Sequence, residues 1–518
     1  MPGVKRLASD YAYAFSGLAP FFSGDPTEKS AWAAAIARTQ AHPRRHADVA
    51  AILRAQQQRR GAPAAAVSAA SKLADPLAIA IVTGQQAGLF GGPVYTILKA
   101  LTAIKLAERV GREHNVTAVP VFWIESEDHD WDEVRSCTVL DAEMMPKTLG
   151  LPARAAGDPV PVAAVRLDEQ ITSVISELEQ VLPQTEFHDS LLADLRAAYS
   201  PGAGMSEAFG RFLERVLGGH GLVVYDASDP AAKPLCADLF ARELSEPGRT
   251  AKLAAAAGAD LTAAGYYAQV QPADLNSVSL FRLDGGRRPI QQPAELVREA
   301  KEKPAGFSPG VLLRPLVQDT VLPTACYVAG PNELAYLGQL RTVYDRFGVP
   351  MPLIYSRATA TILDSAAMRF LSKYQVPFES LHSQDDSALN ELLKTQIPPQ
   401  VEDALASVVR SLDERMSRVV EALPLLDPTL EGAAKTTLGK MQKDLESLQG
   451  KTIQAAKKKN DTLRRQFQRT RALAFPDGQP QERTIAFVWF LNQYGEAFVE
   501  RLWQELPLDM GTHWVVTI

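Results

Sequence analysis

Between residues 77 and 134 the pattern of apolar and polar positions predicts one strand, loop, helix and strand. An apolar run over 77–82 leads into a glycine-rich loop over 83–93, and helical periodicity follows. A second apolar run over 118–124 then ends in a dense group of acids. This order is typical of two parallel strands joined by a crossover helix.

Three further apolar runs end in polar residues in the same manner. They cover residues 221–226, 323–330 and 351–355. Five such strands with helical spacers predict an α/β protein with a doubly wound parallel sheet. The segments 141–218 and 246–320 interrupt this rhythm, and we expect both to be insertions that wall the carboxyl edge of the sheet.

The rest of the chain divides into segments of different character. Residues 1–76 carry helix-start signals and are expected to form a helical accessory segment before a core over 77–384. From 385 to 474 the apolar positions alternate in steps of four and three. This spacing predicts an antiparallel coiled-coil hairpin with its turn near 423–428. The tail over 475–518 holds enough aromatic residues to pack back on the core.

Composition and charge narrow the class of protein. The 518 residues are 46% hydrophobic with a net charge of −6, as in a soluble globular protein without an overall affinity for nucleic acid. No window predicts a membrane span and no secretory signal is evident. The isolated Cys137, Cys236 and Cys326 fit a packing role in a reduced cytoplasm. The basic residues over 457–471 are interpreted as a solvated helix face rather than a nucleic-acid site.

The loop after the first strand contains several glycines but matches neither the dinucleotide fingerprint nor the Walker loop. The glycines of interest are Gly84, Gly88, Gly91 and Gly92. Glycine allows close approach of the backbone, and the helix after Pro93 begins with free N–H groups, so the loop is a candidate nucleotide-binding site. A tight turn needed only for packing is the alternative. Lys99 and Lys105 on the helix are expected to be solvated.

The segment after the second strand combines acids with one histidine and reads ESEDHDWDE over 125–133. Ligands of open α/β sheets bind beyond the carboxyl ends of the strands, so chemistry is expected here. A carboxylate of Asp128 or Asp130 beside His129 would make the imidazole a general base near neutral pH. A divalent cation is a competing ligand, but no second histidine stands nearby and no metal is predicted. An acidic loop that caps a helix is the structural alternative.

Several motifs together resemble a known family. In chain order they are GQQAGLFGGPVYTILK, PVFWIESEDHDWDEV, LLRPLVQDTVLPT, YVAGPNELAYLGQL, GVPMPLIYSRA and FPDGQPQER, followed by a late His513. They resemble the bacillithiol biosynthesis cysteine-adding enzymes, or cysteine ligases, over nearly the whole chain. The resemblance implies a Rossmann-like core with two inserted connecting segments and a C-terminal coiled coil that forms a homodimer.

The resemblance also implies a reaction, in which the carboxyl group of cysteine is joined to the amine of glucosaminyl-malate. A carboxylate and an ammonium do not condense usefully at neutral pH, so the acid must be activated and the amine deprotonated. Activation by ATP or another nucleotide would use the backbone over 84–93. Deprotonation would use His129, Asp128 or Asp130.

Polar residues near the other strand ends are expected to bind these small-molecule substrates. A guanidinium from Arg314 or Arg357 would pair with the malate carboxylates. Hydrogen bonds to the sugar hydroxyls suit Gln85, Gln86, Asn332 and Glu333.

Two features of related chemistry are absent from the sequence. No lysine-rich KMSKS-like loop follows the last strand, and no cysteine and histidine cluster could hold zinc. A nucleotide-binding sensor or scaffold with a coiled-coil interaction arm is therefore the rival interpretation.

Overall fold

The chain divides into two structural units. The computed structural model describes residues 5–155 and 159–518, apart from the side chains of 456, 457 and 459. The lysine run at 457–459 therefore lies partly outside the described residues. The first unit comprises Met1–Ile362 and Pro480–Val516, and the second comprises Leu363–Gln479. None of the described helices is both long and apolar enough to cross a bilayer.

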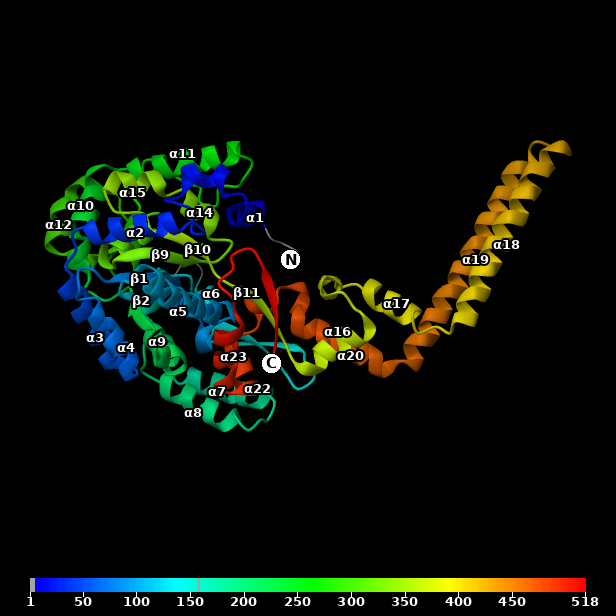
Figure 1. Ribbon diagram of the computed structural model, residues 1–518, viewed down its shortest axis with the longest axis horizontal. Helices are drawn as coiled ribbons and strands as arrows, with labels where there is room; N and C mark the ends of the chain where they lie inside the picture. The colour runs from blue at the N-terminus through cyan, green and yellow to red at the C-terminus, as the bar shows by residue number, and fades with distance from the viewer. Residues whose placement is uncertain (1–4, 156–158) are drawn as a thin grey trace. The chain divides into compact units, whose positions relative to one another are not determined.

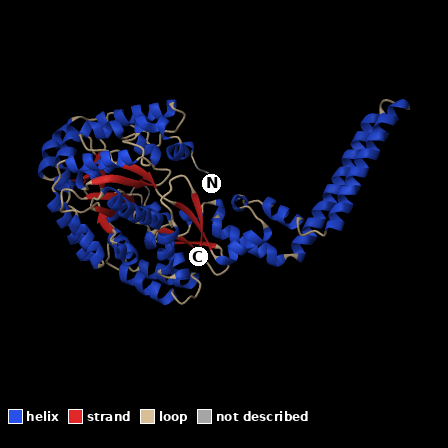
Figure 2. Ribbon diagram, in the orientation of Figure 1, coloured by secondary structure: helices blue, strands red, loops and turns tan. Residues whose placement is uncertain are grey.

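A parallel sheet forms the centre of the first unit (Figures 1 and 2). Its spatial order is β10-β9-β1-β2-β5, and each neighbouring pair is parallel. The strands are β1 (Ile79–Gln85), β2 (Ala118–Ile124), β5 (Val223–Asp226), β9 (Thr324–Ala329) and β10 (Leu353–Ser356). All five predicted strands are confirmed. The chain builds outward from β1 in one direction and then from β9 in the other, so the switch point of the topology lies between these two strands.

Helices cover both faces of the sheet, which confirms the doubly wound α/β fold. Ile79 and Ile81 of β1 pack on one face against α2 (Lys29–Ala41) and α5 (Tyr95–His114). Ala80 and Val82 point to the opposite face, as strand alternation requires. That face is covered by α1 (Arg6–Tyr13), α3 (His46–Arg60), α4 (Ala64–Lys72), α10 (Ala237–Ser245), α13 (Arg314–Val321) and α15 (Arg341–Phe347). The N-terminal helices, expected to be accessory, therefore form part of the core.

Two inserted segments separate the strands of the sheet. The segment between β2 and β5 contains α6 (Trp131–Val134), β3 (Ser136–Leu140), β4 (Pro146–Gly150), α7 (Gln170–Val181), α8 (His188–Ala198) and α9 (Met205–Leu217). The segment between β5 and β9 contains α11 (Arg249–Ala263), α12 (Val297–Glu302) and a small antiparallel sheet of β6 (Leu280–Leu283), β7 (Arg287–Pro289) and β8 (Phe307–Pro309). The short α14 (Leu334–Gly338) follows β9.

The C-terminal tail belongs to the first unit. It contains α21 (Gln481–Thr484), α22 (Phe487–Tyr494), α23 (Ala497–Glu505) and β12 (His513–Thr517), and β12 pairs with β11 (Thr359–Leu363). Bridges from Ala486 to Pro93 and from Ile485 to Thr138 join the tail to the glycine loop and to β3. The tail thus packs against the glycine loop and the strand that lie next to the carboxyl edge of the sheet.

The second unit is helical. Its hairpin consists of α18 (Pro399–Ala422) and α19 (Leu430–Lys459), which run side by side in Figure 1 and confirm the predicted coiled coil. The unit also contains α16 (Ser365–Tyr374), α17 (Ser387–Lys394) and α20 (Asp461–Ala474). The boundary falls at residue 363 rather than at 385, because α16 packs on α20 through the Asp364–Arg469 ion pair and a Phe370–Phe467 ring contact.

The hairpin leaves an apolar stripe uncovered. All residues of α18 are described and none of them is buried. The stripe consists of side chains that are 40–49% exposed, namely Val401, Val408, Val419, Met441 and Leu448. Apolar coiled-coil positions in this state are typical of an interface.

Candidate active site

Two cavities open near the carboxyl ends of the parallel strands. Cavity A, of about 470 Å³, lies at the ends of β1, β2 and β9, and therefore at the switch point. Its polar lining comprises Gln85, Gln86, Glu125, Asp128, Glu133, Gln269, Arg287, Arg314, Tyr327, Glu333 and Tyr336. Cavity B, of about 420 Å³, lies beyond β10 and is lined by the loop after β9 and by the tail. Its polar lining includes Asn332, Ser356, Arg357, Glu482, Arg483 and His513.

Glu125 is the carboxylate best suited to proton transfer in cavity A. It follows the last residue of β2, and its side chain is 18% exposed. Trp123 Nε1 donates to one of its oxygens at 3.2 Å, and Arg314 Nε lies 3.1 Å from the same oxygen. Burial raises the pKa of Glu125 to about 7, although Arg314 opposes the shift. A carboxyl group with this pKa can both accept and release a proton at neutral pH.

Two arginines bring positive charge to cavity A from the second insertion and α13. Arg314 donates to the Tyr336 hydroxyl at 2.6 Å, so its guanidinium is held between that ring and Glu125. Arg287 lies 3.2 Å from Asp128 Oδ1 and stacks 4.1 Å from the centre of the Phe281 ring. The second insertion therefore lines the cavity, as expected. Residues 141–218, predicted as the first insertion, contribute none of the described lining residues of cavity A, but the N–H groups of Val162 and Ala163 donate to the carbonyls of Asp128 and Ser126 in the acidic segment.

Lys99 lies beneath cavity A instead of facing solvent. Its side chain is 3% exposed, and its ammonium donates to the Gly84 carbonyl at 2.8 Å and pairs with Glu333 Oε2 at 2.8 Å. Burial lowers the pKa of Lys99, while Glu333 acts to raise it. The expectation of a solvated Lys105 is also wrong, because its ammonium donates to the backbone carbonyls of Trp503 and Leu506. Both lysines meet segments that are distant in the sequence, which helical periodicity alone does not reveal.

The three residues predicted to be catalytic separate in the structure. Asp128 lines cavity A and accepts a hydrogen bond from Gln86 Nε2 at 2.8 Å. His129 does not line the cavity: its side chain is 47% exposed and its Nδ1 lies 3.3 Å from Asp128 Oδ1. Asp130 is exposed and caps α6 by accepting from the Glu133 N–H at 3.1 Å. The helix-capping alternative thus describes Asp130, and only Asp128 of the three reaches the cavity.

The predicted substrate-binding residues divide between the two cavities. Gln85, Gln86, Arg314 and Glu333 line cavity A, whereas Asn332 and Arg357 line cavity B. The Arg357 guanidinium is already occupied, because it donates to Glu482 at 2.7 and 3.0 Å and to the Ala358 carbonyl at 2.8 Å. This bidentate pair is buried, so Arg357 holds the tail against the strand ends rather than offering a free fork to a ligand.

Most of the glycine loop is turned inward. The N–H groups of Gly88, Gly91 and Gly92 donate to the carbonyls of Gln86, Gly88 and Leu89 at 2.9–3.1 Å. A Cβ on Gly91 would lie 2.2 Å from the Phe487 ring, and the residue has a φ of +89°. These residues therefore do not fit a phosphate cradle, and the packing alternative describes them better. Gly84 differs, since it belongs to β1 and lines cavity A.

Sequence reasoning singled out neither Glu125 nor Arg287. The position of Glu125 directly after β2 was a usable signal, because strand ends line the cavity. No local signal marks Arg287, which β6 and β7 bring in from the insertion. The next acid, Glu127, is directed away from the cavity into a buried ion pair with Lys233. Glu125 thus lines cavity A, whereas Glu127, two residues later, forms a buried ion pair.

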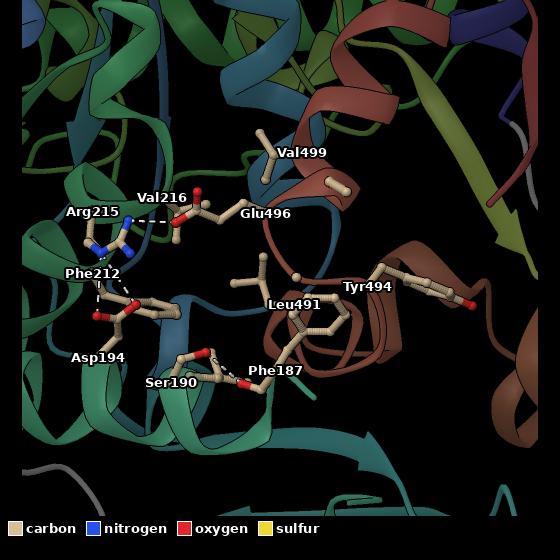
Figure 3. Close-up of a pocket in the computed structure, with 13 residues that line it drawn as sticks. Phe187, Ser190, Asp194, Phe212, Arg215, Val216, Leu491, Tyr494, Glu496 and Val499 are labelled. Carbon is tan, nitrogen blue, oxygen red and sulfur yellow. Dashed lines mark hydrogen bonds and ion pairs between the residues drawn. The ribbon is translucent and has the colours of Figure 1, made fainter. Parts of the chain in front are cut away.

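A third cavity, of about 460 Å³, lies between α8, α9, α22 and α23 (Figure 3). Arg215 crosses one side of it, 2.9 Å from Glu496 and 3.3 Å from Asp194, and the remaining lining is largely aromatic and aliphatic. The close-up shows the Leu491 and Phe187 side chains pointing into it. Its charged groups are paired with one another, and it lies away from the strand ends.

Neither the cysteines nor clustered metal-type ligands add to the site. Cys137, Cys236 and Cys326 are all buried, and burial raises the pKa of the Cys137 and Cys236 thiols to about 12. In the described ranges no three histidine, cysteine, aspartate or glutamate side chains converge as metal ligands.

The fold and cavity A together define a Rossmann-like α/β protein with a cavity rich in carboxylates at its topological switch point. The family model of the bacillithiol biosynthesis BshC N-terminal Rossmann-like domain matches residues 2–358, and that of the BshC C-terminal coiled-coil domain matches residues 360–518. The chain therefore belongs to the BshC family. This result confirms the resemblance that the sequence motifs indicated.

Relatives with similar sequences carry one name, "Putative cysteine ligase BshC". The protein from Salinibacter ruber is 32% identical over 99% of this chain and 96% of its own length. The protein from Chlorobaculum tepidum is 34% identical over 83% of this chain and 81% of its own. The protein from Symbiobacterium thermophilum is 34% identical over 90% of this chain and 88% of its own.

Proposed function

We propose that this protein is a carbon–nitrogen ligase of bacillithiol biosynthesis that joins the carboxyl group of L-cysteine to the amine of glucosaminyl-malate. Membership of the BshC family and the name of its relatives support the ligase class. The observation that carries the proposal is Glu125, a carboxyl group with a pKa of about 7 in a cavity at the switch point.

Glu125 would act as the base. An ammonium group cannot attack a carbonyl carbon until it loses a proton, and ionised Glu125 would accept that proton as the new C–N bond forms. Four carboxylates line cavity A against two guanidiniums, so the field in the cavity favours an ammonium ligand. They are Glu125, Asp128, Glu133 and Glu333.

The cysteine carboxylate needs a leaving group on one of its oxygens, and we propose ATP or another nucleotide as the co-substrate that supplies it. Arg287 and Arg314 are placed to stabilise negative charge that develops on the carbonyl oxygen, as preorganised donors do. Because the N–H groups of Gly88, Gly91 and Gly92 already donate to carbonyls within the loop, we do not assign the phosphates to it. The nucleotide-binding sensor, the rival interpretation of the sequence, depended on nucleotide binding by the same loop and loses that support.

We also propose that the hairpin forms a homodimer. The stripe from Val401 to Leu448 on α18 and α19 remains 40–49% exposed in the second unit as described. Burying such side chains against a second copy contributes about 25 cal/mol per Å² of apolar surface. A dimer would therefore be stabilised without any change to cavity A.

The ligation reaction can be tested directly. The purified full-length protein is incubated with cysteine and glucosaminyl-malate, with and without ATP, and the condensation product is sought by mass spectrometry. Product that requires both substrates supports the proposal, and product only with ATP supports activation by the nucleotide. If no product forms under any of these conditions, the proposal is contradicted.

A further inference from the structure

We propose that cavity B binds the anionic end of a substrate, with Arg483, Ser356 and Asn332 as the residues that contact it. The chemistry recognised is a group with two or more negative charges, either a pair of carboxylates or a chain of phosphates. Assignment to the malate end of the acceptor rests on the proposed function, whereas anion binding itself does not.

The charge of cavity B is positive. Among the residues that the structure describes, its lining includes Lys5, Arg357 and Arg483 and one carboxylate, that of Glu482. The Arg357 charge is neutralised by the bidentate pair with Glu482. Arg483 is exposed to the cavity, and it forms no ion pair with any residue that the structure describes. A guanidinium in this state can pair with a carboxylate or phosphate through two parallel hydrogen bonds.

Ser356 provides a second and independent indication of a ligand. It is the last residue of β10, it is 4% exposed, and it lines cavity B. Its hydroxyl forms no hydrogen bond with any described residue and is accessible from the cavity, so it can donate to a ligand there. Asn332 also lines cavity B, and its exposed amide forms no hydrogen bond with any described residue. A bound anion would accept hydrogen bonds from both side chains.

His513 closes the cavity without adding charge. Its two ring nitrogens lie 3.1 and 3.0 Å from the hydroxyls of Thr359 and Thr361. Burial lowers the pKa of His513 to about 4, so the ring is neutral near pH 7. The positive charge that faces the anion therefore comes from Arg483 and Lys5, and the neutral His513 ring only lines the cavity.

Cavities A and B are neighbours in the fold. The neighbouring residues Asn332 and Glu333 line cavity B and cavity A, respectively. Tyr95 contacts residues of both linings, because its hydroxyl accepts from Gln85 Nε2 at 3.2 Å and its ring centre lies 5.6 Å from the Arg483 guanidinium. A molecule with an ammonium at one end and carboxylates at the other would match the acidic cavity A and the basic cavity B.

The proposal is tested by calorimetric binding of two probes, malate and inorganic pyrophosphate, to the full-length protein. We expect at least one probe to bind, and Arg483→Ala to weaken that binding at least tenfold, because it removes a charge-assisted pair. Ser356→Ala should weaken it several-fold. Arg501→Ala, an exposed arginine of α23 that pairs with Glu505, is the matched control and should bind as the wild type does.

Each outcome bears on the proposal. Weaker malate binding in Arg483→Ala assigns the site to carboxylates, and an effect on pyrophosphate alone assigns it to phosphates. Absence of binding by both probes, or affinities unchanged in Arg483→Ala, would overturn the proposal. Binding does not require turnover. If ligation fails while the probes still depend on Arg483, the proposed function is wrong and the anion site stands.

Discussion

Replacing Glu125 by Gln should abolish a rise in kcat/KM between pH 6 and pH 8 that a carboxyl group of ordinary pKa would not produce. With a pKa of about 7, Glu125 is about one tenth ionised at pH 6 and about nine tenths ionised at pH 8. If the ionised form is the base, kcat/KM for amide formation rises about tenfold over this interval. An ordinary glutamate is almost fully ionised at pH 6 and would give no rise. Glu125→Gln should lose about 10²-fold to 10⁴-fold in rate.

Folding stability gives a second measure of the same pKa. The pKa of folded Glu125 is raised, so its stabilising contribution is complete below about pH 4.5 and is lost as the pH rises through about 7. A shift from 4.5 to about 7 corresponds to about 3 kcal/mol. The difference in unfolding free energy between the wild type and Glu125→Gln should therefore fall by up to about 3 kcal/mol between pH 4.5 and pH 8.

The controls separate this carboxyl group from its surroundings. The groups that face Glu125, namely Arg314, Glu127, Asp128 and Arg287, are present in both proteins, so the comparison changes only the carboxyl group at position 125. Glu143→Gln makes the same change at an exposed site and should behave as the wild type. A wild-type rate that is flat from pH 6 to pH 8, or a Glu125→Gln profile that keeps the rise, would refute the reasoning.

Three further predictions concern the scaffold. Gly91→Ala should destabilise the protein by about 3 kcal/mol or more in urea unfolding, because the new Cβ would lie 2.2 Å from an aromatic ring. The control Gly61→Ala has a φ of +73° in open space and should cost about 1 kcal/mol. Equal losses in the two variants would contradict the assignment of Gly91 to a buried loop. Lys99→Met should cost about 3–5 kcal/mol, since a partly buried carboxylate loses its partner, and an unchanged melting curve would argue against the pair. Val408→Glu with Leu448→Glu should sediment as a monomer where the wild type sediments as a dimer; a double variant that remains dimeric would exclude the stripe as the interface.

The strands and the hairpin could be predicted from the sequence because their signals are local. Apolar runs such as 118–124 are buried on both faces, and the period of the coiled coil repeats over many turns. The position of the site followed from the same pattern, since polar residues after parallel strands meet at one edge. Asp128 and Gln86 were placed in this way.

The roles of individual side chains could not be predicted, because they depend on partners that are distant in the sequence. Lys99 is buried since Glu333, more than two hundred residues later, supplies the opposite charge. In the sequence Arg357 has no evident partner, but in the structure its guanidinium pairs with Glu482 of the tail. Gly91 resembles a phosphate-binding glycine, but Phe487 of the tail fills the space that a ligand would need. The tail thus decides two of these three roles, those of Arg357 and Gly91.

The formation of one bond tests the central claim most directly. Cysteine labelled with ¹³C at its carboxyl carbon and glucosaminyl-malate labelled with ¹⁵N at its amine are incubated with the protein and ATP, and the product is examined by NMR. Joining of these two atoms predicts a one-bond ¹³C–¹⁵N coupling in the product formed by the wild type, and a much smaller yield with Glu125→Gln. A product without that coupling, or no product at all, would contradict the account.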